Sequence, residues 1–270
     1  MKPLEEIKSQ QSIQLLKELH ILTREGKINQ DSRRKLKQVY HLYKFIEPIL
    51  TEVSSSNAPF HLVDHGAGKS YLGFILYDLF IKLTKGRVTS IEINEQLVER
   101  SSLLAKRLMF ERMHFIQCDA AKSATYIKED INIVTALHAC DTATDDAINF
   151  GIQKNAQWII VIPCCQAEIA RNLKKQKSQT LHKPVSELWR HALHTREFGS
   201  HLTNVLRSLQ LESQGYQVTV TELVGWEHSM KNEIIIAKFI DQKNNKSRSR
   251  IQKILEEFHL EELKPKFLGN

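Results

Sequence analysis

The feature that most constrains this chain is an apolar run that ends in an acid and a glycine turn, at Phe60–Tyr71 (FHLVDHGAGKSY). A second apolar run, Val88–Ile93, delivers another acid, Glu92. Between the two runs, apolar side chains recur at helical spacing, at Leu72, Ile75, Leu76, Leu79, Phe80 and Leu83. Strand, glycine turn, helix, strand and acid form the opening unit of a doubly wound α/β fold that binds a nucleotide-type ligand.

Charge and composition restrict the classes of function. The 270 residues are 41% hydrophobic and 26% charged, as in ordinary globular proteins, and the net charge of +7 favours an anionic partner such as nucleic acid. No stretch reaches the ~18 apolar residues of a membrane helix. The first ten residues, MKPLEEIKSQ, include charged side chains and lack the apolar core of a signal peptide. The four cysteines follow no disulfide spacing. We therefore expect a cytoplasmic protein with no membrane partner.

The sequence pattern divides the chain into three parts. Residues 1–56 predict an N-terminal helical extension that ends at a serine-rich linker, Ser54–Pro59. Strands and helices alternate over residues 57–240, which predicts a parallel sheet with crossover helices. Residues 241–270 predict a basic linker and a last amphipathic helix. The parallel strands are expected at 60–64, 87–93, 113–117, 131–137 and 157–162, with helices near 70–84, 95–109, 121–128 and 144–154.

The end of the α/β region follows a different pattern. Residues 185–214 predict a helix with a break near Phe198–Gly199. Residues 216–224 and 233–239 predict two strands, and the segment between them is too short for a crossover helix. These two strands must therefore pair antiparallel.

A parallel sheet binds its ligand outside the carboxyl ends of its strands, so the residues after each strand are the functional candidates. They are Asp64–Ser70, Glu92, Asp119, Leu137–Asp145 and Pro163–Gln166.

Three ligands compete for the glycine turn. ATP or GTP is disfavoured because Gly68-Lys69-Ser70 would end a P-loop whose first glycine falls at residue 63, which is valine. NAD is disfavoured because Tyr71 stands where a dinucleotide fold needs its third glycine. S-adenosylmethionine requires an acid before the glycines to meet its ammonium group, and Asp64 supplies one. Glu92 is then positioned to accept the ribose hydroxyls and Asp119 the adenine amino group.

Four motifs extend this pattern: DHGAGKSYL at 64–72, LHACDTATD at 137–145, PCC at 163–165 and EHSMKN at 227–232. With them the chain resembles the class I S-adenosylmethionine-dependent methyltransferases, and within that class a branch distantly like the enzymes that methylate a ribose in the tRNA acceptor stem. Ser70 departs from the broader class, where many members have a third glycine. The resemblance implies a Rossmann-like α/β fold with a seven-stranded, mostly parallel sheet and an antiparallel terminal hairpin. It implies S-adenosylmethionine as cofactor, bound by Asp64, Gly66, Ala67, Gly68, Glu92, Ile93, Asp119, Ala120 and Leu137.

The acceptor is expected to lie over the loop that follows the fourth strand. His138 is the candidate general base, because an imidazole titrates near neutral pH, although it is as well suited to holding the loop. Asp141 is the second catalytic candidate, as an orienting group, and Thr144-Asp145 is expected to cap the next helix. Cys164 and Cys165 are candidate substrate contacts, and either is more simply explained as a small buried residue than as a nucleophile.

Basic residues cluster in three segments. Residues 166–207 carry eight lysines and arginines against three acids, residues 242–253 carry five with no acid, and residues 33–37 carry a third group. Within the first cluster Lys174, Lys175 and Lys177 are the candidate substrate contacts. We expect RNA, either tRNA or rRNA, as substrate. A small molecule, a protein, or a nucleic acid that is bound without turnover remain alternatives. We expect no metal, since His182, His191, His194 and His201 lack a metal-ligand spacing.

Overall fold

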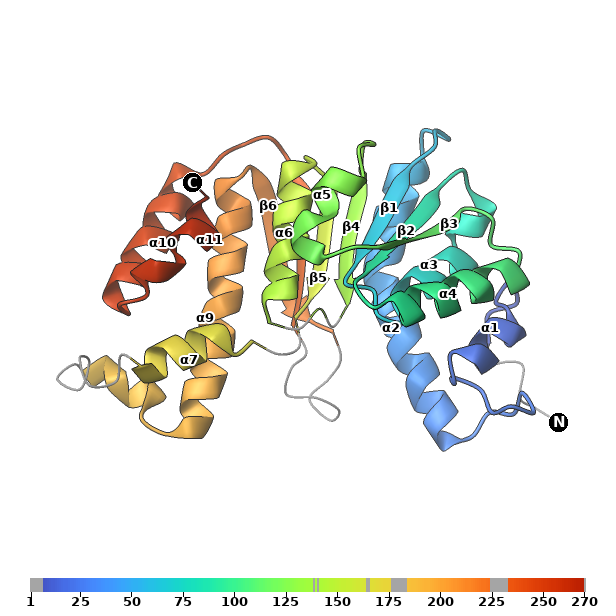
Figure 1. Cartoon of the computed structure of the whole chain (residues 1–270), viewed down its shortest axis with the longest axis horizontal. Helices are drawn as coiled ribbons and strands as arrows, with labels where there is room; N and C mark the ends of the chain where they lie inside the picture. Colours follow the sequence, from blue (N-terminus) through green and yellow to red (C-terminus); the bar gives the residue numbers. More distant parts are fainter. Residues whose placement is uncertain are drawn as a thin grey trace.

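A computed structural model describes residues 7–137, 139, 141–163, 166–175, 184–223 and 233–269. It contains a seven-stranded sheet with strand order β3-β2-β1-β4-β5-β7-β6 (Figure 1). β1 to β5 pair in parallel, and β7 pairs antiparallel with both β5 and β6. The predicted Rossmann-like sheet with its antiparallel hairpin is confirmed. The strands span His61–His65, Arg87–Glu92, Met113–Gln117, Ile133–Leu137, Trp158–Ile162, Tyr216–Glu222 and Glu233–Phe239.

Helices connect the strands and extend both ends of the chain. The α-helices are α1 (Ile13–Glu18), α2 (Gln30–Ser54), α3 (Tyr71–Leu79), α4 (Glu95–Arg107), α5 (Ser123–Tyr126), α6 (Thr142–Gln153), α7 (Glu168–Lys175), α9 (Ala192–Ser213), α10 (Asn245–Glu257) and α11 (Lys264–Leu268). Short 3₁₀ segments lie at η1 (Ile81–Leu83), η2 (Ala120–Lys122), η3 (Pro184–Trp189) and η4 (Glu261–Leu263). None of the described helices is long and apolar enough to cross a membrane.

The alternation of side chains along each strand places helices on both faces of the sheet. Leu62 of β1 packs in a cluster with apolar residues of α1, α2, α3 and α4. Val63, the next residue, packs in a second cluster with α5, α6 and the C-terminal half of α9. Both residues are fully buried, so β1 lies at the centre of a three-layer molecule.

The N-terminal helices lie against the same face as α3. Leu36, Tyr43 and Ile46 of α2 are buried in one cluster with Phe74 of α3. In Figure 1 the parallel strands end at the lower edge of the sheet, and α1 and the start of α2 lie at that level on one side, with α7 on the other. The boundary at residue 56 stays a prediction.

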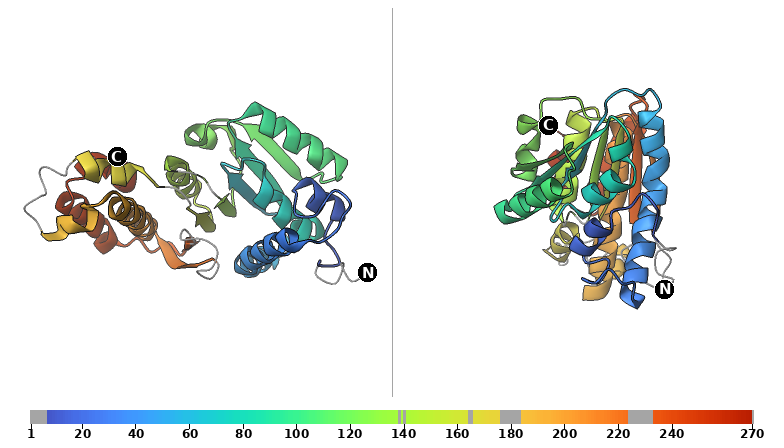
Figure 2. Two further views of the ribbon diagram at one scale, coloured as in Figure 1. Left: turned by 90° about the horizontal axis from the view of Figure 1, so that it is seen from below. Right: turned by 90° about the vertical axis from the view of Figure 1, so that its right-hand side faces the viewer.

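A third cluster joins the C-terminal helices to α9. It contains Leu173 of α7, Trp189 of η3, Leu206 of α9 and Ile251 of α10. These helices form the end of the molecule opposite α1 and α2 (Figures 1 and 2).

The predicted break near Phe198–Gly199 is wrong, because α9 is continuous from Ala192 to Ser213. Gly199 serves a close helix contact instead. A Cβ at this position would lie 2.8 Å from both the backbone nitrogen and the Cβ of Ala170 in α7.

The predicted linker at residues 241–250 is also partly wrong. Asn244 accepts hydrogen bonds from the backbone N–H groups of Lys246 and Ser247, at 3.0 and 3.2 Å, and so caps a helix that begins at Asn245. The basic side chains of this segment therefore project from α10 rather than from a flexible connection.

Candidate functional site

The glycine turn joins β1 to α3 through residues with left-handed backbone. Gly66 and Gly68 have φ of +64° and +56°, which glycine adopts without strain. Ser70, the residue before α3, also has a positive φ of 52°. The turn is fixed to β2, because the N–H of Ala67 donates to the carbonyl oxygen of Ile91 at 2.8 Å. A Cβ added to Gly68 would meet no atom within 4 Å, so open space lies beside the turn.

Glu92 ends β2 and holds the glycine turn with its side chain. Its Oε2 accepts the N–H of Gly68 at 2.8 Å, and its Oε1 accepts the N–H of Asn94 at 3.0 Å. The next residue, Ile93, is 65% exposed, which is unusual for a large apolar side chain beside a carboxylate. An anion, a glycine turn and an uncovered apolar side chain therefore meet at the ends of β1 and β2.

Asp64 lies at the same edge but inside the protein. Its Oδ1 accepts the hydroxyl of Thr135 in β4 at 2.9 Å, and its Oδ2 accepts the N–H of Gly73 in α3 at 3.2 Å. Burial raises the pKa of Asp64 to about 7, and these two hydrogen bonds oppose that rise. Both carboxylate oxygens thus join β1 to β4 and α3. The predicted contact of Asp64 with a cofactor stays a prediction.

Asp119 follows β3 and is exposed. Its Oδ1 accepts the N–H of Ala121 at 3.1 Å, so it caps the 3₁₀ turn that begins at Ala120. Leu137 ends β4 and is half-buried. All three acids expected to bind the cofactor therefore lie at or just beyond the carboxyl ends of parallel strands, and two of them, Asp64 and Glu92, hold the backbone around the glycine turn.

Asp141 lies in the loop after β4 and has a positive φ of 52°. Its Oδ1 accepts the N–H groups of Ala167 and Glu168 at 3.0 and 3.2 Å, and its Oδ2 pairs with Arg171 at 2.9 Å. Burial alone raises the pKa of Asp141, but the hydrogen bonds from α7 and Arg171 outweigh it and hold the pKa below its usual value. Asp141 is thus ionised at neutral pH and caps the first turn of α7.

Arg207 of α9 is the centre of a buried polar network that the sequence did not reveal. Its side chain is fully buried and pairs with Asp145 at 2.6 Å. It also donates to the carbonyl oxygen of Asp141 at 2.8 Å and to the side-chain oxygen of Asn204 at 3.2 Å. The predicted capping role of Asp145 is therefore replaced by an ion pair that fixes the loop after β4 to α9.

The same network reaches two more loops of the predicted site. Asn204 accepts a hydrogen bond from Gln166 at 2.9 Å and donates one to Glu233 at 2.8 Å. Gln166 directly follows the PCC motif, and Glu233 directly follows the EHSMKN motif. Ser200 donates to Gln166 at 2.6 Å. One face of α9 therefore connects the loops after β4 and β5 with the start of β7.

A family model described as a methyltransferase domain matches residues 34–172. The chain belongs to this family.

Curated relatives are similar to this chain over part of their own length. The mouse "Glutathione S-transferase C-terminal domain-containing protein" is 29% identical over 64% of the chain and 24% of its own length. The human protein of that name is 27% identical over 79% of the chain and 34% of its own length. The chain thus spans a quarter to a third of the relatives it matches.

Similar solved structures include magnesium protoporphyrin IX methyltransferase from Synechocystis PCC 6803 with bound SAH. It is 13% identical, with a TM-score of 0.46, over 84% of this chain and 94% of that one. Another is an rRNA methylase from Streptococcus thermophilus, 10% identical with a TM-score of 0.42, over 67% of this chain and 87% of that one.

The structure changes the basic cluster predicted at residues 166–207. Arg207 is buried in an ion pair, so it is not available to a substrate. Arg171 pairs with Asp141, and two further surface pairs join Arg190 to Glu187 and Arg196 to Glu197. Lys174 and Lys175 are exposed at the end of α7.

Several predicted residues lie outside the described part of the chain. They are His138, Cys140, Cys164, Cys165, Lys177, His182 and the EHSMKN motif at 227–232. Their predicted roles therefore stay predictions. Within the described ranges, no group of three or more histidine, cysteine or acidic side chains is placed to hold a metal ion.

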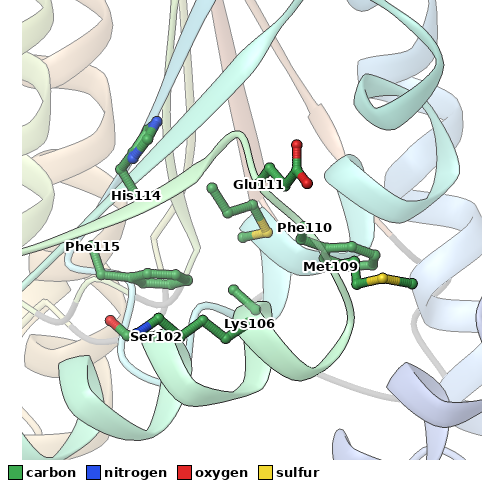
Figure 3. Close-up of a pocket in the computed structure, with 9 residues that line it drawn as sticks. Ser102, Lys106, Met109, Phe110, Glu111, His114 and Phe115 are labelled. Atoms are coloured by element: carbon green, nitrogen blue, oxygen red, sulfur yellow. The ribbon is translucent and has the colours of Figure 1, made fainter.

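A cavity of about 490 Å³ lies away from the glycine turn, between the end of α4 and the start of β3 (Figure 3). Its lining includes His114 and Phe115 of β3 and Ser102 and Lys106 of α4, which Figure 3 labels. A parallel strand binds ligands beyond its carboxyl end, whereas this cavity adjoins the amino end of β3. It is therefore separate from the candidate methyltransferase site. A second cavity, of about 370 Å³, lies near the turn and includes Lys69 and Tyr71.

Proposed function

We propose that this protein transfers a methyl group from S-adenosylmethionine to RNA. The observation that carries the cofactor assignment is the position of Glu92, whose carboxylate bridges the N–H groups of Gly68 and Asn94 at the ends of β1 and β2. Membership of the methyltransferase-domain family supports the reaction class.

The residues at this edge fit the cofactor chemically. Open space beside Gly68 admits a ligand close to the backbone, and Glu92 presents an anion that can accept hydrogen bonds from a ribose. The exposed side chain of Ile93 offers an apolar surface to an adenine ring, and the exposed carboxylate of Asp119 offers an acceptor to its amino group. When bound, S-adenosylmethionine supplies a methyl group on a sulfonium centre.

The side chains of the protein must then position the acceptor and accept its proton. We assign the acceptor to the loops after β4 and β5, which Asp141 and the Arg207 network hold together. His138 is proposed as the general base and Asp141 as a positioning residue that keeps this loop against α7. Cys164 and Cys165 are proposed to contact the substrate. These assignments follow the motif resemblance and await functional tests.

RNA is proposed as the acceptor because exposed cations flank this edge. Lys174 and Lys175 project from the end of α7, which Asp141 anchors beside the loop after β4. Cations placed in this way contact phosphates and position a nucleic acid without reading its sequence. The resemblance to enzymes of the tRNA acceptor stem favours tRNA first and rRNA second.

A methyl-transfer screen tests the acceptor. The full chain is incubated with methyl-tritiated S-adenosylmethionine and separately with total RNA, protein or small metabolites. We expect label in the RNA fraction, and loss of label with Glu92→Ala. Label in the protein or metabolite fraction alone would refute RNA as acceptor while leaving the reaction class intact. Tight binding of the cofactor with no label in any fraction would identify a binding protein without turnover.

A further inference from the structure

A cationic pocket adjoins the glycine turn on the side of the N-terminal helices. Its volume of about 370 Å³ lies within the ~300–1,000 Å³ typical of small-ligand sites. The pocket is lined by the start of α3, one face of α4 and the residues at the end of α1. The sequence pattern drew attention to Lys69 and Tyr71 in the glycine turn, but it did not predict that α1 and α4 complete a pocket with them.

The charge of the pocket lining is positive. Lys69, Arg100 and Arg107 contribute cations, and Glu18 is the acid among the lining residues. Glu18 pairs with Arg107 at 3.1 Å. Within the described ranges, Lys69 and Arg100 form no salt bridge with an acidic side chain. Two exposed cations without acidic partners on one small cavity favour an anionic ligand.

An apolar wall completes the pocket. Tyr71 and Leu97 are half-buried beside it, and Leu103 is 52% exposed. Burial raises the pKa of Tyr71, so its phenol stays neutral at physiological pH. Cations together with aromatic and aliphatic surface suit a nucleotide, since the phosphate needs charge and the base needs a flat apolar contact.

The pocket lies between the glycine turn and the basic start of α2. Lys69 directly follows Gly68, whose N–H is held by Glu92. On the other side, Lys35 at the start of α2 donates to the carbonyl oxygen of His20 at 2.9 Å, and His20 lines the pocket. Lys35 belongs to the basic segment at residues 33–37 and also pairs with Asp31 at 2.8 Å, so the start of α2 lies next to the pocket with part of its charge neutralised. In Figure 1 these elements lie together at the lower edge, opposite α7.

We propose that this pocket binds one nucleotide of a single-stranded part of the RNA substrate, separate from the nucleotide that is methylated. Lys69 and Arg100 hold its phosphate, and the wall of Tyr71 and Leu97 packs against its base. The inference rests on RNA being the substrate of the proposed methyltransferase. It gives the N-terminal helices a function, because the residues after α1 close one side of the pocket.

Fluorescence anisotropy with a labelled single-stranded RNA of mixed sequence tests the proposal. Arg100→Ala is the test variant, and Lys106→Ala is its matched control, because Lys106 is an exposed cation on the same helix that lines the separate cavity near β3. We expect Arg100→Ala to weaken RNA binding severalfold and to lower the slope of log affinity against log salt by about 1. Equal effects of the two variants would overturn the proposal.

Two further measurements separate this site from the cofactor assignment. Calorimetry should give Arg100→Ala the same affinity for S-adenosylhomocysteine as the wild-type protein. Ultraviolet cross-linking with 4-thiouridine RNA should label the peptides that contain Tyr71 or residues 97–107, and cross-links confined to other segments would contradict the proposal. If RNA binding depends on Arg100 but S-adenosylhomocysteine does not bind, the pocket stands and the methyltransferase assignment fails. If S-adenosylhomocysteine binds and RNA does not, the pocket proposal fails.

Discussion

The carboxylate of Asp64 lies inside the protein at the end of β1, where Thr135 and Gly73 donate to its two oxygens. Burial raises its pKa to about 7 from an ordinary value of 3.8. In the unfolded chain this group loses its proton near pH 4, whereas in the folded protein it keeps the proton until about pH 7. The folded state therefore binds more protons between these values, and the contribution of Asp64 to stability falls as the pH rises through that window.

Asp64→Asn removes this titration and keeps the shape of the side chain. We expect the free energy of unfolding of the wild type, relative to the Asn variant, to fall by a few kcal/mol from pH 4 to pH 7. Urea denaturation of both proteins at several pH values measures this difference. Asp119→Asn is the control, because Asp119 is exposed. A difference between wild type and Asp64→Asn that does not change with pH would refute the raised pKa.

Glu92 is the residue whose loss most directly affects the proposed cofactor site. Replacing it with alanine removes a carboxylate that accepts two backbone N–H groups and is proposed to accept the ribose hydroxyls. Hydrogen bonds to charged groups contribute ~1.5–3 kcal/mol, so S-adenosylhomocysteine should bind about tenfold more weakly or worse. Calorimetry checks this, with Glu95→Ala as the control, since Glu95 begins α4 and is exposed. Wild-type affinity in Glu92→Ala would remove Glu92 from the site.

Among the helices and strands, α9 has the most features that the sequence pattern did not predict. Apolar runs with acids and glycines at their ends predicted the five parallel strands and the hairpin, because strand burial leaves a local signal. Glycine is unfavourable in helices, so the sequence predicts a helix break at Gly199, but this glycine instead allows the close approach of Ala170 from α7. Arg207 resembled any other basic residue, since its partner Asp145 lies 62 positions away in the sequence.

Gly199→Ala tests the contact between α7 and α9. The added methyl group would meet the backbone of Ala170 at 2.8 Å, and backbone atoms cannot rotate away. Overpacking costs ~1–3 kcal/mol, and the better helix propensity of alanine returns ~1 kcal/mol, so we expect a net loss of up to about 2 kcal/mol. Urea denaturation measures the loss, with the exposed His201→Ala on the same helix as control. A variant more stable than wild type would show that the added methyl group meets no obstacle and that the two helices are not this close.

Arg207→Met tests the buried network in the same helix. The change leaves Asp145 buried, and among the described residues its remaining cationic partner is Lys266, at 3.3 Å. Breaking a buried pair by removing one partner costs ~3–5 kcal/mol, whereas an exposed pair contributes ~0–1 kcal/mol. Arg196→Met, which breaks the exposed pair with Glu197, is therefore the control. If the free energy of unfolding falls by the same small amount in both variants, Arg207 does not hold the loops together.

At the scale of the whole molecule, the edge where the parallel strands end lies between two helical regions. The N-terminal helices share one core with β1 and α3, and α7 with the C-terminal helices shares another with α9. The composition predicted neither arrangement, because packing between distant segments leaves no periodic signal in the sequence. The sequence could predict the candidate cofactor residues, since each lies at or just beyond the carboxyl end of a strand. The buried network and the cationic pocket were not, since both join residues from several elements.

The central claim is that the edge formed by β1, the glycine turn and Glu92 binds S-adenosylmethionine. The most direct measurement is a calorimetric titration of the full chain with S-adenosylhomocysteine, with NAD and ATP titrated in parallel. We predict saturable binding of S-adenosylhomocysteine at about micromolar Kd, equivalent to ~8 kcal/mol, and no binding of the other two. Absence of S-adenosylhomocysteine binding, or binding of NAD or ATP in its place, would contradict the assignment.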